Sequence, residues 1–130
     1  MKPLLEGIFT YANTASDFRT AIGGRFYFAE AIQGATFPFA VYSLVSLDID
    51  YHFAGHQINP LMQISIFSKD TGSVEVNTIW GYMAARFDDA EITVSGYSAV
   101  EFRRDQARLL REPENNIWHY ATDYELILTV

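Results

Sequence analysis

The chain has 130 residues, 49% of them hydrophobic, and carries a formal net charge of −7 from 16 acidic and 9 basic side chains. This length predicts one domain over residues 1–130, with enough apolar material for a packed core instead of a disordered chain. The acidic balance argues against tight duplex binding through phosphate neutralisation, and the absence of cysteine excludes disulfides and thiolate sites.

The N-terminus and the hydropathy pattern predict neither export nor membrane insertion. Glu6 comes too early for the apolar region of a secretory signal peptide. No apolar run approaches the roughly 18 residues of a transmembrane helix. We therefore expect a soluble intracellular product with no membrane partner.

The beginning of the chain predicts two helices followed by a short strand. Apolar residues recur at helical spacing over residues 3–11, namely Leu4, Leu5, Ile8 and Phe9. Ser16 is suited to cap a second, short helix, which the glycines at positions 23 and 24 end. Residues 25–29 then resume as a strand with Phe26 and Phe28 on one face.

Residues 39–67 predict a long hairpin. Alternate positions form the apolar face of its first arm: Val45, Leu47, Ile49, Tyr51 and Phe53. We expect residues 55–60, which include Gly55 and Pro60, to turn the chain. The next strand, residues 61–67, then buries Met62, Ile64 and Ile66.

Residues 73–88 predict the strongest helix of the chain. Ser73 is a candidate N-cap, and five apolar residues follow at helical spacing: Val76, Ile79, Trp80, Met83 and Phe87. We expect Trp80 to pack on the sheet. With the strands at 61–67 and 91–94, this helix can form a crossover that makes one strand pair parallel.

Residues 98–110 and 118–130 predict a second long hairpin around the turn residues Pro113 and Asn116. Arms of roughly ten residues exceed the usual five or six, so we expect part of this ribbon to serve a contact outside the monomer. The predicted fold class is α+β. It has a mainly antiparallel sheet, mixed if the crossover forms, with long hairpins and two or three helices packed on one face.

A row of polar residues in the first hairpin offers one alternative function. Asp48, Asp50 and His52 alternate along a strand, and His56 follows four residues later. Such a row is suited to a divalent cation, but a solvated polar face explains the same alternation, and short motifs of this kind match by chance. We therefore expect no metal and no cofactor, and keep a small metal-binding or enzymatic domain as the alternative.

The only basic cluster lies in the second hairpin. It consists of Arg103, Arg104, Arg108 and Arg111, interleaved with Glu101, Asp105 and Glu112. Mixed charge of this kind favours a salt-bridged or interface ribbon over a nucleic-acid site. The chain also lacks a nucleophile elbow, a zinc-protease helix motif and a thiol nucleophile. We expect no catalytic residues and no enzymatic activity.

The order of short sequence features is similar to that of one known family. These features are Gly23-Gly24-Arg25 before the strand Phe26-Tyr27-Phe28 and Glu30-Ala31, the segment Phe37-Pro38-Phe39-Ala40-Val41-Tyr42, the strand at 63–68 leading into a helix, and the turn at Pro113 before Ile117-Trp118-His119-Tyr120. Over nearly its whole length the chain resembles the tail-completion, or tail-terminator, proteins of long-tailed bacteriophages and prophages. It departs from them at the late turn, Glu114-Asn115-Asn116, where the family pattern has an Asp/Gly pair, and residues 47–59 match only as a hairpin.

The resemblance implies a structural role in virion assembly. Family members form a ring, usually a hexamer, that caps the tail tube and joins the tail to the head connector, or stopper. The implied partners are copies of the chain itself, the tail tube protein and the connector, with DNA passing through the lumen without specific binding. The implied location is the head–tail interface of the virion, and the host cytoplasm during assembly.

The over-long hairpins suggest where ring contacts lie. An edge strand longer than its own core requires tends to recruit another chain. We therefore expect subunit contacts between residues 47–59 and 98–117, with acidic and basic side chains facing one another. The candidate interface residues are Asp48, Asp50, His52, Arg103, Arg104 and Arg108.

Overall fold

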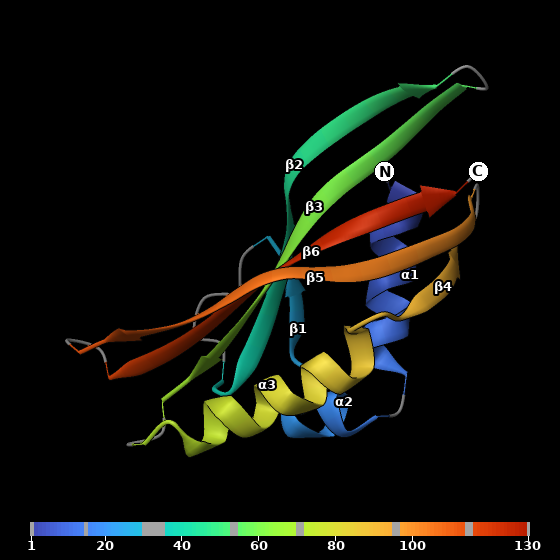
Figure 1. Cartoon of the computed structure of the whole chain (residues 1–130). Coiled ribbons are helices and arrows are strands. Elements are labelled where there is room, and N and C mark those ends of the chain that lie inside the picture. The colour runs from blue at the N-terminus through green and yellow to red at the C-terminus, as the bar shows by residue number, and fades with distance from the viewer. Residues whose placement is uncertain are drawn as a thin grey trace.

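A computed structural model of the chain describes residues 2–14, 16–29, 36–52, 55–69, 72–94, 97–113 and 116–129. The helices are α1 (Lys2–Asn13), α2 (Asp17–Ala21) and α3 (Val74–Phe87). The strands are β1 (Phe26–Phe28), β2 (Phe39–His52), β3 (Gly55–Ser68), β4 (Glu91–Val94), β5 (Tyr97–Glu112) and β6 (Ile117–Thr129). The described strands form one twisted sheet in the order β1-β2-β3-β6-β5-β4, and the helices lie on one of its faces (Figure 1).

The predicted N-terminal helices are confirmed, and their boundaries follow from local chemistry. Leu4, Ile8 and Ala12 recur every four residues along α1 and are buried, which directs this face to the core. The Ser16 hydroxyl accepts a hydrogen bond from the backbone N–H of Arg19 at 3.2 Å and so caps α2. After α2 the chain changes direction at Gly23 and Gly24, whose φ angles of +61° and +73° favour glycine.

The α+β class is confirmed, but the sheet is mixed and its parallel pair is not the one expected. β1 runs parallel to β2, whereas β2–β3, β3–β6, β6–β5 and β5–β4 are antiparallel. The connection from β3 through α3 to β4 crosses over two strands, so β4 is not the neighbour of β3. The late strands β5 and β6 insert between them, a long-range pairing that local sequence patterns do not encode.

The turn predicted at residues 55–60 is wrong. These residues continue β3, which begins at Gly55 and pairs with β2 to the end of that strand. The pairing between β3 and β6 starts only at Leu61, so in the described structure residues 55–60 have one strand neighbour instead of two. An edge of this kind tolerates glycine and proline, because the missing N–H of Pro60 and the missing side chain of Gly55 cost little there.

The core lies between the helices and the inner face of the sheet. It contains Phe18, Phe87, Phe102 and Tyr124, all fully buried. Phe87 contacts Phe102 edge-to-face with ring centroids 5.4 Å apart, a favoured aromatic geometry. None of the described helices is long and apolar enough to cross a membrane.

The predicted position of Trp80 on the sheet is confirmed. Its indole ring stacks on Tyr120 with centroids 4.9 Å apart, and its Nε1–H donates to the Thr122 hydroxyl at 2.9 Å. Ser73 precedes α3 as expected, but its side chain makes no capping hydrogen bond. The first turn is instead held from the sheet, because the Ser68 hydroxyl donates to the Glu75 carboxylate at 2.6 Å.

Both long hairpins project beyond the layered core (Figure 1). The β2–β3 hairpin extends toward the upper right of the view, and the β5–β6 hairpin extends toward the lower left. Their lengths confirm the expectation of two long hairpins, since β2 and β3 each have 14 residues and β5 has 16. The sheet therefore reaches well past the area that the helices cover.

Candidate functional site: two sheet edges and the open face

The outer edge of β5 is exposed over most of its length. β4 pairs with β5 only as far as Glu101, and within the described ranges no strand pairs with the outer side of residues 103–112. Every side chain from residue 103 to residue 112 is exposed, including Leu109 and Leu110, which are 38% and 46% accessible. We call residues 103–112 the β5 edge. A strand in this state presents backbone donors and acceptors to another chain.

A β-bulge at Asp105 sets which side chains of the β5 edge reach each face. The pairing with β6 runs from Arg104 opposite Tyr124 directly to Gln106 opposite Asp123, so Asp105 is the extra residue. Because side chains alternate along a strand, this insertion moves the even-numbered positions after it to the other face. Arg104 thus lies on the helix side, and Gln106 lies on the open face.

On the open face, the bulge is secured by a buried carboxylate. Asp123 is only 6% exposed. It accepts a hydrogen bond from Gln106 Nε2 at 2.9 Å and another from Gln63 Nε2 at 3.1 Å. Amide donors from both neighbouring strands therefore satisfy the carboxylate and fix the register of β5 on β6 and β3. The sequence pattern gave no signal for this cluster beyond the polar character of each residue.

On the helix side, Arg104 is held within the subunit. Its Nη1 lies 3.2 Å from Asp88 Oδ2, and its guanidinium lies over the Trp80 ring, 5.2 Å from the centroid. The Tyr124 hydroxyl donates to the other Asp88 oxygen at 2.7 Å. Burial, reinforced by Asp88, raises the pKa of Tyr124 well above its usual range. This tyrosine stays protonated at neutral pH and acts as an anchor for Asp88, not as a base.

The open face of the sheet carries an aromatic row. Phe39 stacks on Phe67 with centroids 5.1 Å apart, and Phe67 stacks on His119 at 4.4 Å. Together with smaller residues they line a cavity of about 390 Å³, whose walls are Ala29, Phe39, Val41, Ser43, Gln63, Ser65, Phe67 and His119. Burial lowers the pKa of His119, so the imidazole is neutral at pH 7. A cavity of this composition, without an acid–base pair, fits contact better than chemistry.

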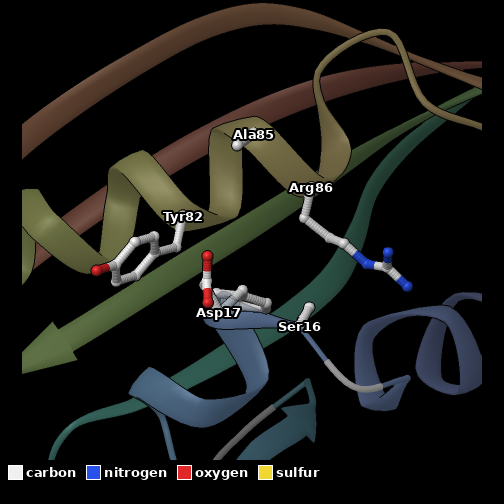
Figure 2. Close-up of a pocket in the computed structure, with 6 residues that line it drawn as sticks. Ser16, Asp17, Tyr82, Ala85 and Arg86 are labelled. Carbon is white, nitrogen blue, oxygen red and sulfur yellow. The ribbon is translucent and has the colours of Figure 1, made fainter.

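A second cavity, of about 320 Å³, lies between α2 and α3 (Figure 2). Ser16, Asp17, Phe18, Tyr82, Ala85 and Arg86 line it. Two of its polar residues already serve the fold, because Ser16 caps α2 and Arg86 Nη2 donates to the Tyr11 carbonyl at 2.8 Å. The Arg86 guanidinium also lies over the Tyr11 ring, 3.9 Å from its centroid. This cavity lies at the junction between α2 and α3.

The structure separates the predicted arginines. Arg103 lies on the open face of β5 and pairs with Glu101 at 3.2 Å, with both side chains partly exposed. Arg108 is exposed on the same face and has no ion-pair partner among the described residues. Arg104 lies on the other face with Asp88. Sequence reasoning missed Asp88 because the end of α3 comes near β5 only in the folded chain.

The predicted acidic residues belong to β2. Asp48, Asp50 and His52 are in the part of that strand whose side chains fall outside the described residues. The backbone register nevertheless pairs His56 with Tyr51, a position that alternates with the other three. His56 and the Asp48 row therefore occupy opposite sets of positions on the ribbon. Over the described side chains, no group of three His, Cys, Asp or Glu residues is placed to hold a metal ion.

The class of protein follows from this geometry and from comparison with known families. A small core with two projecting ribbons and an exposed edge strand is suited to contacts with other chains. The family model of the tail completion protein gp17 matches residues 6–129. The chain therefore belongs to the tail completion protein gp17 family and is a structural protein of the phage tail type.

A solved structure supports the same fold. A chain in the virion of the native gene transfer agent (GTA) particle is similar to this one with a TM-score of 0.80. The similarity covers 98% of this chain and 95% of that chain, at 13% sequence identity. No curated protein matched the sequence.

Proposed function

We propose that this chain is a tail terminator: it forms a ring that caps the finished tail tube and supplies the surface to which the head connector docks. The observation that carries the proposal is the family match over residues 6–129, which spans almost the whole chain. The likeness to a chain of a phage-like virion agrees with a place in the particle itself. The proposed location is the head–tail interface, reached after assembly in the host cytoplasm.

The proposed ring is a hexamer of one domain per subunit. Its contacts use Asp48, Asp50 and His52 on the β2–β3 hairpin of one copy and Arg103 and Arg108 on β5 of the next. Cyclic symmetry lets each subunit use the same pair of complementary surfaces. Arg104, the remaining candidate, is already paired with Asp88, so we assign it to holding the β5 edge in place.

The proposed partners are the tail tube protein on one side of the ring and the head connector on the other. DNA passes through the lumen without specific binding. The net charge of −7 supports this part of the proposal, because an acidic ring repels the phosphate backbone and lets DNA slide. No catalytic step, metal or cofactor enters the proposed function.

A small metal-binding or enzymatic domain is the alternative function. It requires Asp48, Asp50, His52 and His56 to converge on one ion. The β2–β3 register places His56 in the opposite alternating set from the other three, which argues against a shared site.

Removal of the gene tests the proposed function. Cells that produce the particle without this chain should accumulate DNA-filled heads and separate tails, and a plasmid copy of the wild-type gene should restore joined particles. Electron microscopy of the lysates distinguishes these products. Joined particles of normal tail length in the absence of the chain would rule out the terminator function.

Charge reversal tests the proposed contacts. Arg108→Glu should lower the yield of joined particles, because Arg108 is exposed and unpaired among the described residues, so its loss leaves the subunit intact. Arg19→Glu, a charge reversal at another exposed arginine, on α2, is the matched control and should leave the yield unchanged. Equal yields from both variants would remove the β5 edge from the interface.

A further inference from the structure

The sheet has a second unpaired edge, on β2. β1 pairs with β2 only over Ala40 to Tyr42, and the next contact on that side is the Ala29 N–H donating to the Tyr42 carbonyl at 2.8 Å. Beyond this point β2 continues to His52 with β3 on its inner side and, in the described part of the chain, no strand on its outer side. We call residues 43–52 the β2 edge. It equals the β5 edge in length and lies on the opposite side of the sheet.

The two edges carry opposite charge. The β5 edge contains four arginines, Arg103, Arg104, Arg108 and Arg111, against the acids Asp105 and Glu112. The β2 edge contains Asp48 and Asp50 and no lysine or arginine. Four arginines against two acids give the β5 edge a net charge of +2, and the two aspartates give the β2 edge −2, so two copies of the same edge repel overall while the two different edges attract. The pattern therefore selects a head-to-tail contact over a symmetric one.

The strand directions also match. Along the sheet from β2 to β5, each neighbouring pair is antiparallel, so β2 and β5 run in opposite directions. A rotation that continues the sheet from one subunit into the next therefore brings these edges together antiparallel. Full overlap of the two edges places residue 43 opposite residue 112 and residue 52 opposite residue 103, which is a shift of about six residues, or about 20 Å, from the row that joins Ser43 to Gln106 within one subunit. β1 pairs with β2 only up to Tyr42 and β4 pairs with β5 only up to Glu101, so neither strand occupies the β2 edge or the β5 edge.

We propose that the β5 edge of one subunit pairs antiparallel with the β2 edge of the next copy, so that a continuous β-sheet closes the ring. This inference rests on the proposed ring and specifies its contact. The backbone groups left unpaired on both edges supply the hydrogen bonds. In this register Asp48 and Asp50 lie beside the stretch of the β5 edge that ends at Arg108, which adds charge complementarity.

Cysteine cross-linking inside purified particles tests the pairing, and the chain contains no cysteine of its own to interfere. The first variant combines Ser43→Cys with Glu112→Cys, which antiparallel pairing brings together in neighbouring subunits. The matched control combines Ser43→Cys with Arg103→Cys, which that pairing separates by about 30 Å, or nine steps of about 3.3 Å. All three positions lie on the open face, so the variants differ in position along the edge and not in the face they label.

Particles are treated with a short bismaleimide and the chain is followed on a denaturing gel. We expect the 43/112 variant to give a ladder of covalent multimers and the 43/103 variant to give at least tenfold less. A ladder only from 43/103 would show parallel pairing, and no ladder from either variant would show that the edges do not meet; each overturns the inference while leaving the ring in place. If the chain is missing from particles altogether, the proposed function fails as well, so the two failures are distinguishable.

Discussion

Replacing Trp80 by alanine should cost about 3 kcal/mol of unfolding free energy. Truncating a fully buried tryptophan costs about 3–5 kcal/mol, and the partial exposure of Trp80 places it at the lower end. The change removes the stacking on Tyr120 and leaves the fully buried Thr122 hydroxyl without its donor. These two losses are worth about 0.5–1.5 and 1–3 kcal/mol respectively. The effect therefore comes from the junction between α3 and β6.

Two further variants separate these contributions in urea melts. Trp80→Phe keeps an aromatic ring on Tyr120 but removes the N–H donor, so it should cost about 1–2 kcal/mol. Tyr82→Ala, on the exposed side of the same helix, should cost less than about 1 kcal/mol and serves as the control. If Trp80→Ala shifts the midpoint no further than Tyr82→Ala does, the packing of α3 on the sheet is not what stabilises this domain.

Three further predictions concern the bulge, the open face and the metal alternative. Deleting Asp105 should remove the extra residue and leave Arg104 opposite Tyr124 and Gln106 opposite Asp123, so each side chain of the β5 edge should keep its face. Circular dichroism should then show a folded domain, and a deletion variant that does not fold would contradict the assignment of Asp105 as the extra residue. Burial lowers the pKa of His119 in the folded state, so the free energy of unfolding should be highest above pH 6.5 and decline as the pH falls below it. In urea melts, His119→Phe should lack that decline. An equal decline in the wild type and in His119→Phe would contradict the prediction. EDTA or added divalent cations should leave the melting temperature of the wild type unchanged, and a rise that is specific to one cation and lost in Asp50→Asn/His52→Gln would restore the metal-binding alternative.

Local patterns in the sequence predicted most elements, because each is determined by neighbouring residues. The four-residue recurrence from Leu4 to Ile8 identifies α1, and the Ser16 hydroxyl with the paired glycines delimits α2. The apolar spacing that includes Trp80 placed α3 to within one residue of each end. Alternation likewise indicated the long strands.

The misplaced features depend on contacts between distant parts of the chain. Residues 55–60 resemble a turn because of Gly55 and Pro60. Among the described strands they pair with β2 alone, and a strand with one neighbour can contain glycine and proline and remain extended. Strand order depends on where β5 and β6 insert, which alternation alone does not specify. The partner of Arg104 is Asp88 at the end of a helix, so the arginine cluster could be predicted as a group but not divided between two faces.

Locating the chain in the particle tests the central claim most directly. A short epitope tag, fused through a flexible linker to a chain shown to complement the gene deletion, can be visualised in purified particles by gold-labelled antibody and electron microscopy. We expect one cluster of label at the junction between head and tail, and none along the tube. Label distributed along the tube or confined to the tail tip, or particles that join normally and carry no label, would contradict the assignment of this chain as the tail terminator.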